Sequence, residues 1–218
     1  IATFPKLDVR QTYGQTEGGP CGTVLIGSEA LAHIGSAGTP WPQTELRIVD
    51  ENGNDVGPNI VGEIVVRSPS VFSGYFKNEE ATRETLKDGW LFSGDLGQLD
   101  GEGYLFVVDR KKDMVIRGGL NIGTQEVESV LHRYDGVEEA AVIGVPHDKL
   151  GEDLLAVLTV APGVTIDPEA IRQFCADKLA DFKIPRRYEV IAEMPRSPMG
   201  KILKTDLREK YSKALVDA

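Results

Sequence analysis

The chain changes character within Gly103-Tyr104-Leu105-Phe106-Val107-Val108-Asp109-Arg110-Lys111-Lys112-Asp113. Its first six residues, 103–108, favour a β-strand, and the five charged residues that follow are typical of a solvated turn. The sequence before this segment is β-rich, whereas helical and strand patterns mix after it. We therefore predict an α/β protein of the α+β type, in which residues 1–110 form a β-rich unit and residues 111–218 form a small α+β unit.

A hairpin is expected within the β-rich unit. Residues 44–49 alternate polar and apolar side chains and lead into the turn residues Asn52-Gly53. After Gly57-Pro58, residues 62–67 form a second strand-like run. Alternating runs separated by glycine and proline are typical of paired strands joined by a loop.

Helical periodicity begins near Thr124, with apolar side chains spaced three and four residues apart as far as Tyr134. Thr124 is a residue type that caps helices, and Gly136 is one that ends them. Further on, Asp167 followed by Pro168 is a typical helix start. The other expected elements are strands at 140–145, 154–160 and 188–191, and a final helix from about residue 205.

The charge of the chain is unevenly distributed. The net charge is −10, from 24 basic and 34 acidic residues, which argues against a general nucleic-acid binder. Residues 1–110 carry 8 basic and 16 acidic residues, whereas residues 111–218 carry 16 and 18. The second unit therefore holds most of the cations that could meet a phosphorylated ligand.

No segment predicts membrane insertion, secretion or a structural metal. No apolar run approaches the roughly 20 residues that a membrane helix needs. Residues 1–5 lack the basic and apolar regions of a signal peptide, so a cytoplasmic protein is expected. The two cysteines are far apart and follow no metal-ligand spacing, so neither a zinc site nor a disulfide is expected, and Cys175 should lie on the buried side of its helix.

Two glycine-containing segments of the first unit carry groups suited to a nucleotide. Tyr13-Gly14-Gln15-Thr16-Glu17-Gly18-Gly19 offers a hydroxyl for phosphate, a carboxylate for Mg²⁺ and glycines that let the backbone approach a ligand. In Ser93-Gly94-Asp95, the carboxylate could accept hydrogen bonds from a ribose diol. Taken alone, the first segment would more often be a simple turn, and the second an Asp in a hairpin turn.

Two further segments carry cations. In residues 109–113 and the following Arg117-Gly118-Gly119, fixed cations suit a polyphosphate and the glycine pair permits close approach, although a solvated hairpin has the same pattern. In Pro195-Arg196-Ser197-Pro198-Met199-Gly200-Lys201, prolines restrict a loop that ends in a lysine. Such a lysine can act as a point charge over developing negative charge, although alone it would be an ordinary surface residue.

Together, these segments resemble the adenylate-forming superfamily of acyl-CoA and aryl-CoA synthetases, luciferases and peptide-synthetase adenylation domains. The matching motifs are Tyr-Gly-Gln-Thr-Glu at 13–17, Ser-Gly-Asp at 93–95, Tyr-Leu-Phe-Val-Val-Asp-Arg-Lys-Lys-Asp at 104–113, and Pro-Met-Gly-Lys at 198–201. The resemblance extends from Tyr13 to the last helix. It implies that residues 1–110 are the C-terminal end of a large adenylation domain, and that residues 111–218 are a small mobile C-terminal domain.

The resemblance also implies a reaction in two steps. A fatty or aromatic carboxylate attacks the α-phosphate of Mg-ATP, giving an acyl-adenylate and pyrophosphate. The thiol of coenzyme A then displaces AMP and forms a thioester, after the small domain has swung about a hinge. The implied partners are therefore a small carboxylic acid, ATP with Mg²⁺, and coenzyme A.

Each candidate residue takes its role from the motif that it matches. The nucleotide-binding positions are Tyr13, Gly14 and Gln15 along the adenine, Thr16 at a phosphate, Glu17 as the Mg²⁺ ligand, and Asp95 with Arg110 at the ribose. The other positions are Lys112 at the hinge, Gly118 and Gly119 in the thiol channel, and Lys201, which bridges the carboxylate and the α-phosphate and acts in catalysis with Thr16 and Glu17.

The sequence departs from the family in two respects. At Leu120-Asn121-Ile122-Gly123-Thr124, many relatives have Glu or Tyr followed by Asn-Ile-Tyr-Pro, which leaves the shape of the thiol channel open. The Ser/Thr/Gly-rich phosphate loop and most of the acyl pocket, which the family carries upstream, are not in this chain. We therefore expect a fragment that does not form adenylate by itself.

Two alternative functions are consistent with the same motifs. The first is an adenylation domain that loads the thiol of a carrier protein instead of coenzyme A. The second is a non-catalytic nucleotide-binding relative that has kept the fold. The presence of Glu17, Asp95, Arg110 and Lys201 argues against the second, because a degenerate copy would tend to lose some of them.

Overall fold

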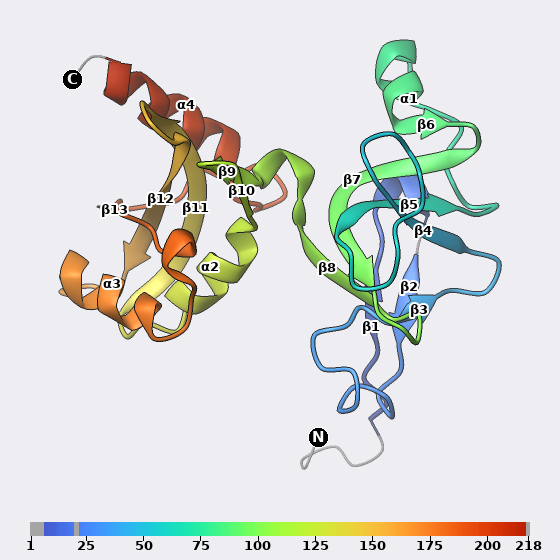
Figure 1. Ribbon diagram of the computed structural model, residues 1–218, viewed down its shortest axis with the longest axis horizontal. Coiled ribbons are helices and arrows are strands. Elements are labelled where there is room, and N and C mark those ends of the chain that lie inside the picture. The colour runs from blue at the N-terminus through green and yellow to red at the C-terminus, as the bar shows by residue number, and fades with distance from the viewer. Residues whose placement is uncertain (1–6, 20–21, 217–218) are drawn as a thin grey trace. The chain divides into compact units, whose positions relative to one another are not determined.

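A computed structural model of the protein describes residues 7–19 and 22–216, with side chains described as far as residue 212. The chain divides into two compact units, Ile1–Lys111 and Lys112–Ala218, which we call unit 1 and unit 2. Figure 1 shows the strands of unit 1 in blue to green and the elements of unit 2 in green to red. The division falls within the charged segment 109–113, where the short 3-10 turn η2 spans Lys111–Asp113.

Unit 1 is built mainly from antiparallel strands. Its three-stranded sheet has the order β1-β2-β3, from Gln11–Tyr13, Thr23–Leu25 and Thr39–Pro40. Its five-stranded sheet has the order β4-β5-β7-β6 with β8 also paired to β7, from Glu45–Val49, Gly62–Arg67, Trp90–Leu99, Leu86–Lys87 and Leu105–Arg110. The helical elements are η1 at Thr16–Gly18 and α1 at Glu79–Thr85.

The predicted hairpin of unit 1 is confirmed by the pairing of β4 with β5. The strands run antiparallel, and Ile48 lies opposite Ile64. Both side chains belong to a buried cluster with Val66 and Leu105, which joins β8 to the same core. The strand expected from Gly103 begins two residues later, at Leu105.

Unit 2 mixes helices and strands. Its strands are β9 at Val115–Arg117, β10 at Leu120–Ile122, β11 at Val137–His147, β12 at Gly151–Val160 and β13 at Arg187–Val190. They form one sheet of order β10-β9-β12-β11, with β13 parallel to β12. The helical elements are α2 at Thr124–Leu131, α3 at Pro168–Ala176, η3 at Asp181–Lys183 and α4 at Lys204–Val216.

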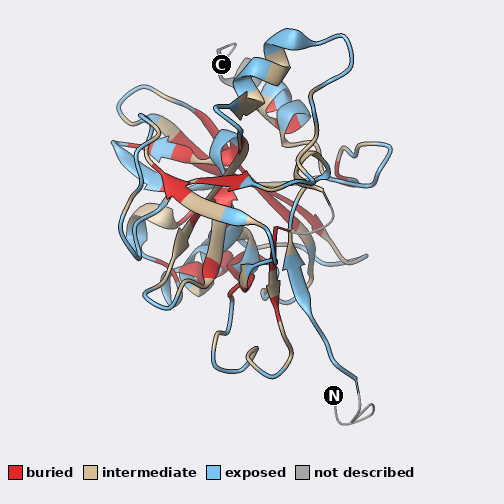
Figure 2. Ribbon diagram, turned by 90° about the vertical axis from the view of Figure 1, so that its right-hand side faces the viewer, coloured by how far each residue is buried: buried red, intermediate tan, exposed pale blue. Residues whose placement is uncertain are grey.

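The central hairpin of unit 2, β11 and β12, is buried on both faces. Successive side chains of a strand point to opposite faces, so Val142 and Ala156 pack with α2 and α3, whereas Ile143 and Leu155 pack with α4. Figure 1 shows α4 and the pair α2–α3 on opposite sides of the sheet. In Figure 2 the buried residues lie mainly on strands, and most loops are exposed.

The helices confirm some sequence predictions and correct others. The Asp167 side chain caps α3 by accepting from the Glu169 amide, as expected for an Asp-Pro start, and Cys175 is fully buried. The Thr124 cap is wrong, because Gly123 occupies the cap position and Thr124 is the first helical residue.

Helix α2 is also shorter than predicted. It ends at Leu131, five residues before Gly136, because the chain turns there toward β11. With its mainly antiparallel sheets and separate helices, the protein has the α+β architecture that the sequence predicts. Within the described residues, no helix is long and apolar enough to cross a membrane.

Candidate functional site

The segment 13–17 leaves strand β1 and turns at once. Tyr13 ends β1, and the amide of Gly18 donates to the carbonyl of Gln15 at 3.0 Å to close η1. The Phe72 amide donates to the Glu17 carbonyl at 2.8 Å and fixes the turn from a distant loop. Thr16, at the start of η1, is exposed and accessible to a ligand.

Asp95 projects from a bulge in β7. The pairing with β5 changes register so that the single residue Ile64 faces the three residues Ser93–Asp95. Gly94 has a φ of 71°, which only glycine adopts readily. Bulges of this kind re-aim a side chain and are common beside functional sites. Asp95 therefore lies inside a ten-residue strand and not in a hairpin turn.

Side chains hold the bulge in place. The Ser93 hydroxyl donates to the Ile64 carbonyl at 2.6 Å and accepts from the Asp95 amide at 3.0 Å. The Gly94 amide donates to Oε1 of Glu63 at 3.2 Å. The position of Asp95 is therefore set by β5 as well as by its own strand.

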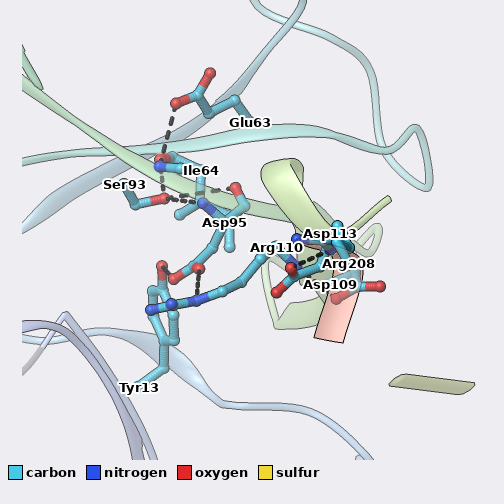
Figure 3. Close-up of polar contacts among 10 residues, drawn as sticks. Tyr13, Glu63, Ile64, Ser93, Asp95, Asp109, Arg110, Asp113 and Arg208 are labelled. Carbon is cyan, nitrogen blue, oxygen red and sulfur yellow. Dashed lines mark hydrogen bonds and ion pairs between the residues drawn. The ribbon is translucent and has the colours of Figure 1, made fainter. Parts of the chain in front are cut away.

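Two groups meet the Asp95 carboxylate (Figure 3). The Tyr13 hydroxyl donates to Oδ2 at 2.9 Å, and Nε of Arg110, which lies directly opposite on β8, is 3.5 Å from Oδ1. The Asp95 side chain is 15% exposed and that of Arg110 is 48% exposed. Burial raises the pKa of Tyr13, and the neighbouring Asp95 charge adds to this effect, so the phenol stays protonated as a donor.

A polar pocket lies beside this cluster. Its volume is about 320 Å³, and it is lined by Gln15, Glu63, Tyr75, Glu84, Thr85, Lys87, Phe92, Ser93, Gly94 and Lys111. The Tyr75 hydroxyl donates to Oε1 of Glu17 at 2.8 Å, and the Lys111 ammonium donates to Oε2 of Glu63 at 2.8 Å. Sequence reasoning missed Tyr75 and Glu63, because their partners are 58 and 48 residues away.

The donor set of unit 1 fits a nucleotide with a magnesium ion. Asp95 supplies acceptors for hydroxyl groups, and Thr16 supplies a hydroxyl at the turn. Mg²⁺ usually takes one or two carboxylates and completes its shell with phosphates and water. Glu17 can be such a ligand, because Oε2 has no hydrogen-bond partner within the described residues. The same part of the chain has no group of three or more His, Cys, Asp or Glu that could hold a metal alone.

The remaining candidate residues belong to unit 2, so the structure does not place them with those of unit 1. Gly118 and Gly119 form the two-residue turn between β9 and β10, with φ of 57° and 84°. Both values are left-handed, as this hairpin turn requires. Lys112 is exposed in η2, and Lys201 is exposed on the loop before α4.

A buried ion pair supports the glycine turn. Nε of Arg117, the residue before Gly118, is 2.8 Å from Oδ1 of Asp153, and Nη1 donates to the Phe182 carbonyl at 2.8 Å. Nη2 is buried and has no hydrogen-bond partner in the described part of the chain. The base of the turn is thereby joined to β12 and to the loop that contains η3.

Comparison with known families matches both ends of the chain. Residues 2–76 match the family described as "AMP-binding enzyme", and residues 126–201 match "AMP-binding enzyme C-terminal domain". The chain belongs to the adenylate-forming, AMP-binding enzyme superfamily. The two matched ranges include the motif at 13–17 and Lys201, whereas Asp95, Arg110 and the glycine turn lie between them.

Individual relatives of this superfamily align with nearly the whole chain. A feruloyl-CoA synthase from Amycolatopsis is 44% identical over 92% of the chain, and a 2-succinylbenzoate–CoA ligase from Bacillus cereus is 43% identical over 93%. The chain covers 41% and 42% of those proteins, so it spans about two fifths of the length of the curated relatives that it matches.

Solved structures of one superfamily member show the same fold. The o-succinylbenzoate CoA synthetase from Bacillus subtilis, in complex with its acyl-adenylate OSB-AMP, aligns with a TM-score of 0.88 and 37% identity. That alignment covers 92% of this chain and 41% of the synthetase chain. The same enzyme with ATP and magnesium ion aligns with a TM-score of 0.86 and 36% identity.

Proposed function

We propose that the protein activates a carboxylic acid with Mg-ATP to an acyl-adenylate and pyrophosphate, and then transfers the acyl group to the thiol of coenzyme A. The observation that carries the proposal is the Asp95 carboxylate, held on a strand bulge between the Tyr13 hydroxyl and the Arg110 guanidinium. A fixed acceptor of this kind suits a ribose diol. Membership of the superfamily and the names of the relatives support the same activity.

In this proposal unit 1 binds the nucleotide. Asp95 accepts hydrogen bonds from the ribose hydroxyls, with Arg110 beside it, and Tyr13, Gly14 and Gln15 lie along the adenine. Thr16 contacts a phosphate, and Glu17 is the protein ligand of Mg²⁺, which neutralises phosphate charge when it is bound. The pocket beside Ser93 and Tyr75 gives the nucleotide room.

Lys201 supplies the cation for the adenylation step. Attack of the carboxylate at the α-phosphorus builds negative charge on the non-bridging oxygens, and a positioned ammonium group stabilises that charge. The Lys201 ammonium has no partner among the described residues, so it is available to a substrate. Lys112 acts as the hinge that lets unit 2 present Lys201 in the first step and the Gly118–Gly119 turn in the second.

The proposed acceptor is coenzyme A, and the proposed acid is aromatic. Two relatives that align with this chain are named for CoA and for feruloyl and succinylbenzoate groups, both of which are aromatic. The exposed Gly118–Gly119 turn has no side chains at its tip, so a slender thiol arm can pass close to the backbone. A carrier-protein thiol is the alternative acceptor.

A panel of acids tests the proposal on the full-length protein. With ATP, Mg²⁺ and coenzyme A, an aromatic acid should give AMP and a thioester identified by mass spectrometry. Lys201→Ala should slow adenylation about 10²- to 10³-fold, with an unchanged thermal unfolding curve. If AMP is released but the thioester forms only on a carrier protein, the acceptor is the carrier-protein thiol and not coenzyme A. Nucleotide binding without AMP release for any acid would favour the non-catalytic alternative.

A further inference from the structure

The loop that carries Lys201 is a short hairpin, and the lysine lies just after its turn. The Gly200 amide donates to the Ser197 carbonyl at 2.8 Å, and the Ser197 amide donates to the Lys201 carbonyl at 2.8 Å. Gly200 has a φ of 80°, which suits the last residue of a three-residue hairpin loop. The backbone direction at Lys201 is therefore set by this turn.

One side chain holds the turn from outside. Nη1 of Arg196 donates to the Gly200 carbonyl at 2.6 Å, and Nη2 donates to the carboxylate of Glu139. The Gly200 carbonyl belongs to the peptide group that joins Gly200 to Lys201. Glu139 lies on β11, where the register with β12 shifts. Arg196 thus connects the peptide group before Lys201 to the central sheet of unit 2.

The other end of the loop is fixed by Lys204. Its ammonium donates to Oγ1 of Thr124 at 2.7 Å and lies 2.7 Å from Oε1 of Glu128. The same Glu128 oxygen accepts from the Val142 amide of β11 at 2.7 Å. The backbone of the loop is therefore anchored on both sides of Lys201, whereas the Lys201 side chain is exposed.

We propose that Arg196 and Glu139 are a positioning pair for Lys201, an inference that rests on the proposed function of this lysine. A lysine side chain has many rotamers, so the direction from which it leaves the backbone decides how often its ammonium reaches a phosphate. Arg suits this task because its planar fork makes two directed hydrogen bonds at once, which Lys cannot reproduce.

A purely structural role explains the contacts of Arg196 less well than a positioning role does. The two side chains are 38% and 30% exposed, and exposed ion pairs usually contribute little to folding. The Arg196 guanidinium also makes a contact that an ordinary surface pair lacks, with the carbonyl next to Lys201. The Arg196–Glu139 pair therefore acts on the local geometry of the loop. Its loss should lower the rate of adenylation more than it lowers the free energy of unfolding.

The experiment separates the two half-reactions in the full-length protein. ATP–pyrophosphate exchange reports adenylation, and thioester formation from preformed acyl-adenylate reports the second step. Arg196→Ala should slow exchange about 10- to 100-fold and leave the second step unchanged. Arg196→Lys should recover part of the rate, and Glu139→Gln should lose less than Arg196→Ala. The matched control is Arg172→Ala, which removes an exposed bidentate Arg–Glu pair from α3 and should change neither step.

A double variant distinguishes positioning from direct contact. If Arg196 acts through Lys201, Arg196→Ala should cost nothing further once Lys201→Ala is present. Three results would overturn the inference while the proposed function stands. The first is a further loss of rate when Arg196→Ala is added to Lys201→Ala, and the second is an equal loss of rate in both half-reactions for Arg196→Ala. The third is an exchange rate of Arg196→Ala that equals the wild-type rate. If none of the tested acids supports ATP–pyrophosphate exchange by the wild-type protein, the proposed function fails, and the inference fails with it.

Discussion

The two units hold their charged groups in different ways. In unit 1, Asp95 meets the Tyr13 phenol and the guanidinium of Arg110, which is 3.5 Å away on a side chain that is 48% exposed. In unit 2, Arg117 and Asp153 are 2.8 Å apart, with side chains only 4% and 10% exposed. A buried pair must be kept whole, because either partner alone would leave an uncompensated charge. The loose pair of unit 1 can exchange partners with a ligand, whereas the tight pair of unit 2 shapes the backbone before Gly118.

The largest expected effect comes from breaking the buried pair. Arg117→Ala leaves the Asp153 carboxylate without its cation and removes the hydrogen bond to the Phe182 carbonyl. We expect a loss of about 3–5 kcal/mol in the free energy of unfolding, measured by urea denaturation. The control is Arg187→Ala, whose partner Glu189 is 3.7 Å away and exposed, and which should cost no more than about 1 kcal/mol. Equal losses for the two variants would mean that the buried Arg117–Asp153 pair contributes no more to folding than an exposed pair of the same unit.

The next largest effect is expected in unit 1, where removal of the Asp95 carboxylate tests whether it binds a ligand. Asp95→Ala should cost about 1–3 kcal/mol in the free energy of unfolding, because the partly buried Tyr13 hydroxyl loses its acceptor. It should also weaken binding of AMP about 10- to 100-fold, because the nucleotide loses a charged acceptor worth roughly 1.5–3 kcal/mol. Isothermal titration calorimetry measures the change. Asp55→Ala, which removes an exposed carboxylate paired with Arg47, is the matched control and should bind AMP normally. Normal binding by Asp95→Ala would remove this residue from the site.

Local patterns in the sequence predicted much of the fold. The alternation at 44–49 and 62–67 gave β4 and β5. The apolar runs near 140 and 154 gave the two strands of the central hairpin of unit 2, although their pairing was not predicted. Asp167-Pro168 gave the start of α3, because a cap is a contact between near neighbours. The end of α2 was wrong by five residues, since the turn toward β11 depends on how that strand docks in the sheet.

The site was less predictable, because its contacts span the chain. The motifs drew attention to Tyr13 and Asp95, but their hydrogen bond joins residues 82 positions apart. The bulge that carries Asp95 depends on Ile64 of another strand, so no local pattern distinguishes it from a turn. Tyr75 has no motif of its own and was missed for the same reason. The roles of Asp95 and Lys201 stay predictions that the variants above test, and the role of Glu17 stays a prediction.

A smaller effect is expected at the bulge itself. At Gly94 a β-carbon would meet no atom within 4 Å, so Gly94→Ala changes only the backbone, whose φ of 71° an alanine adopts at a cost. We expect a loss of about 1–2 kcal/mol in the free energy of unfolding and weaker AMP binding as Asp95 shifts. Gly101→Ala is the control, because that glycine is also open but has no left-handed φ. Equal stability of the two variants would show that the bulge is not strained by a side chain.

The smallest effect is expected for Tyr13→Phe, which removes one hydrogen bond to Asp95 and should cost about 1 kcal/mol. The pH dependence of this change in stability identifies the Tyr13 phenol better than the size of the change does. Because the folded pKa of Tyr13 is raised by burial, the folded protein keeps a proton that the unfolded chain loses near pH 10. This contribution to stability is complete below about pH 10 and falls as the pH rises further.

Urea denaturation at several pH values between about 9 and 11 should therefore show a steeper loss of stability in the wild-type protein than in Tyr13→Phe. Parallel curves for wild type and Tyr13→Phe would mean that the Tyr13 phenol is not buried against Asp95. In that case the Asp95 carboxylate would lack its neutral donor. The contrast between this accessible carboxylate in unit 1 and the buried Arg117–Asp153 pair in unit 2 would then rest on Arg110 alone.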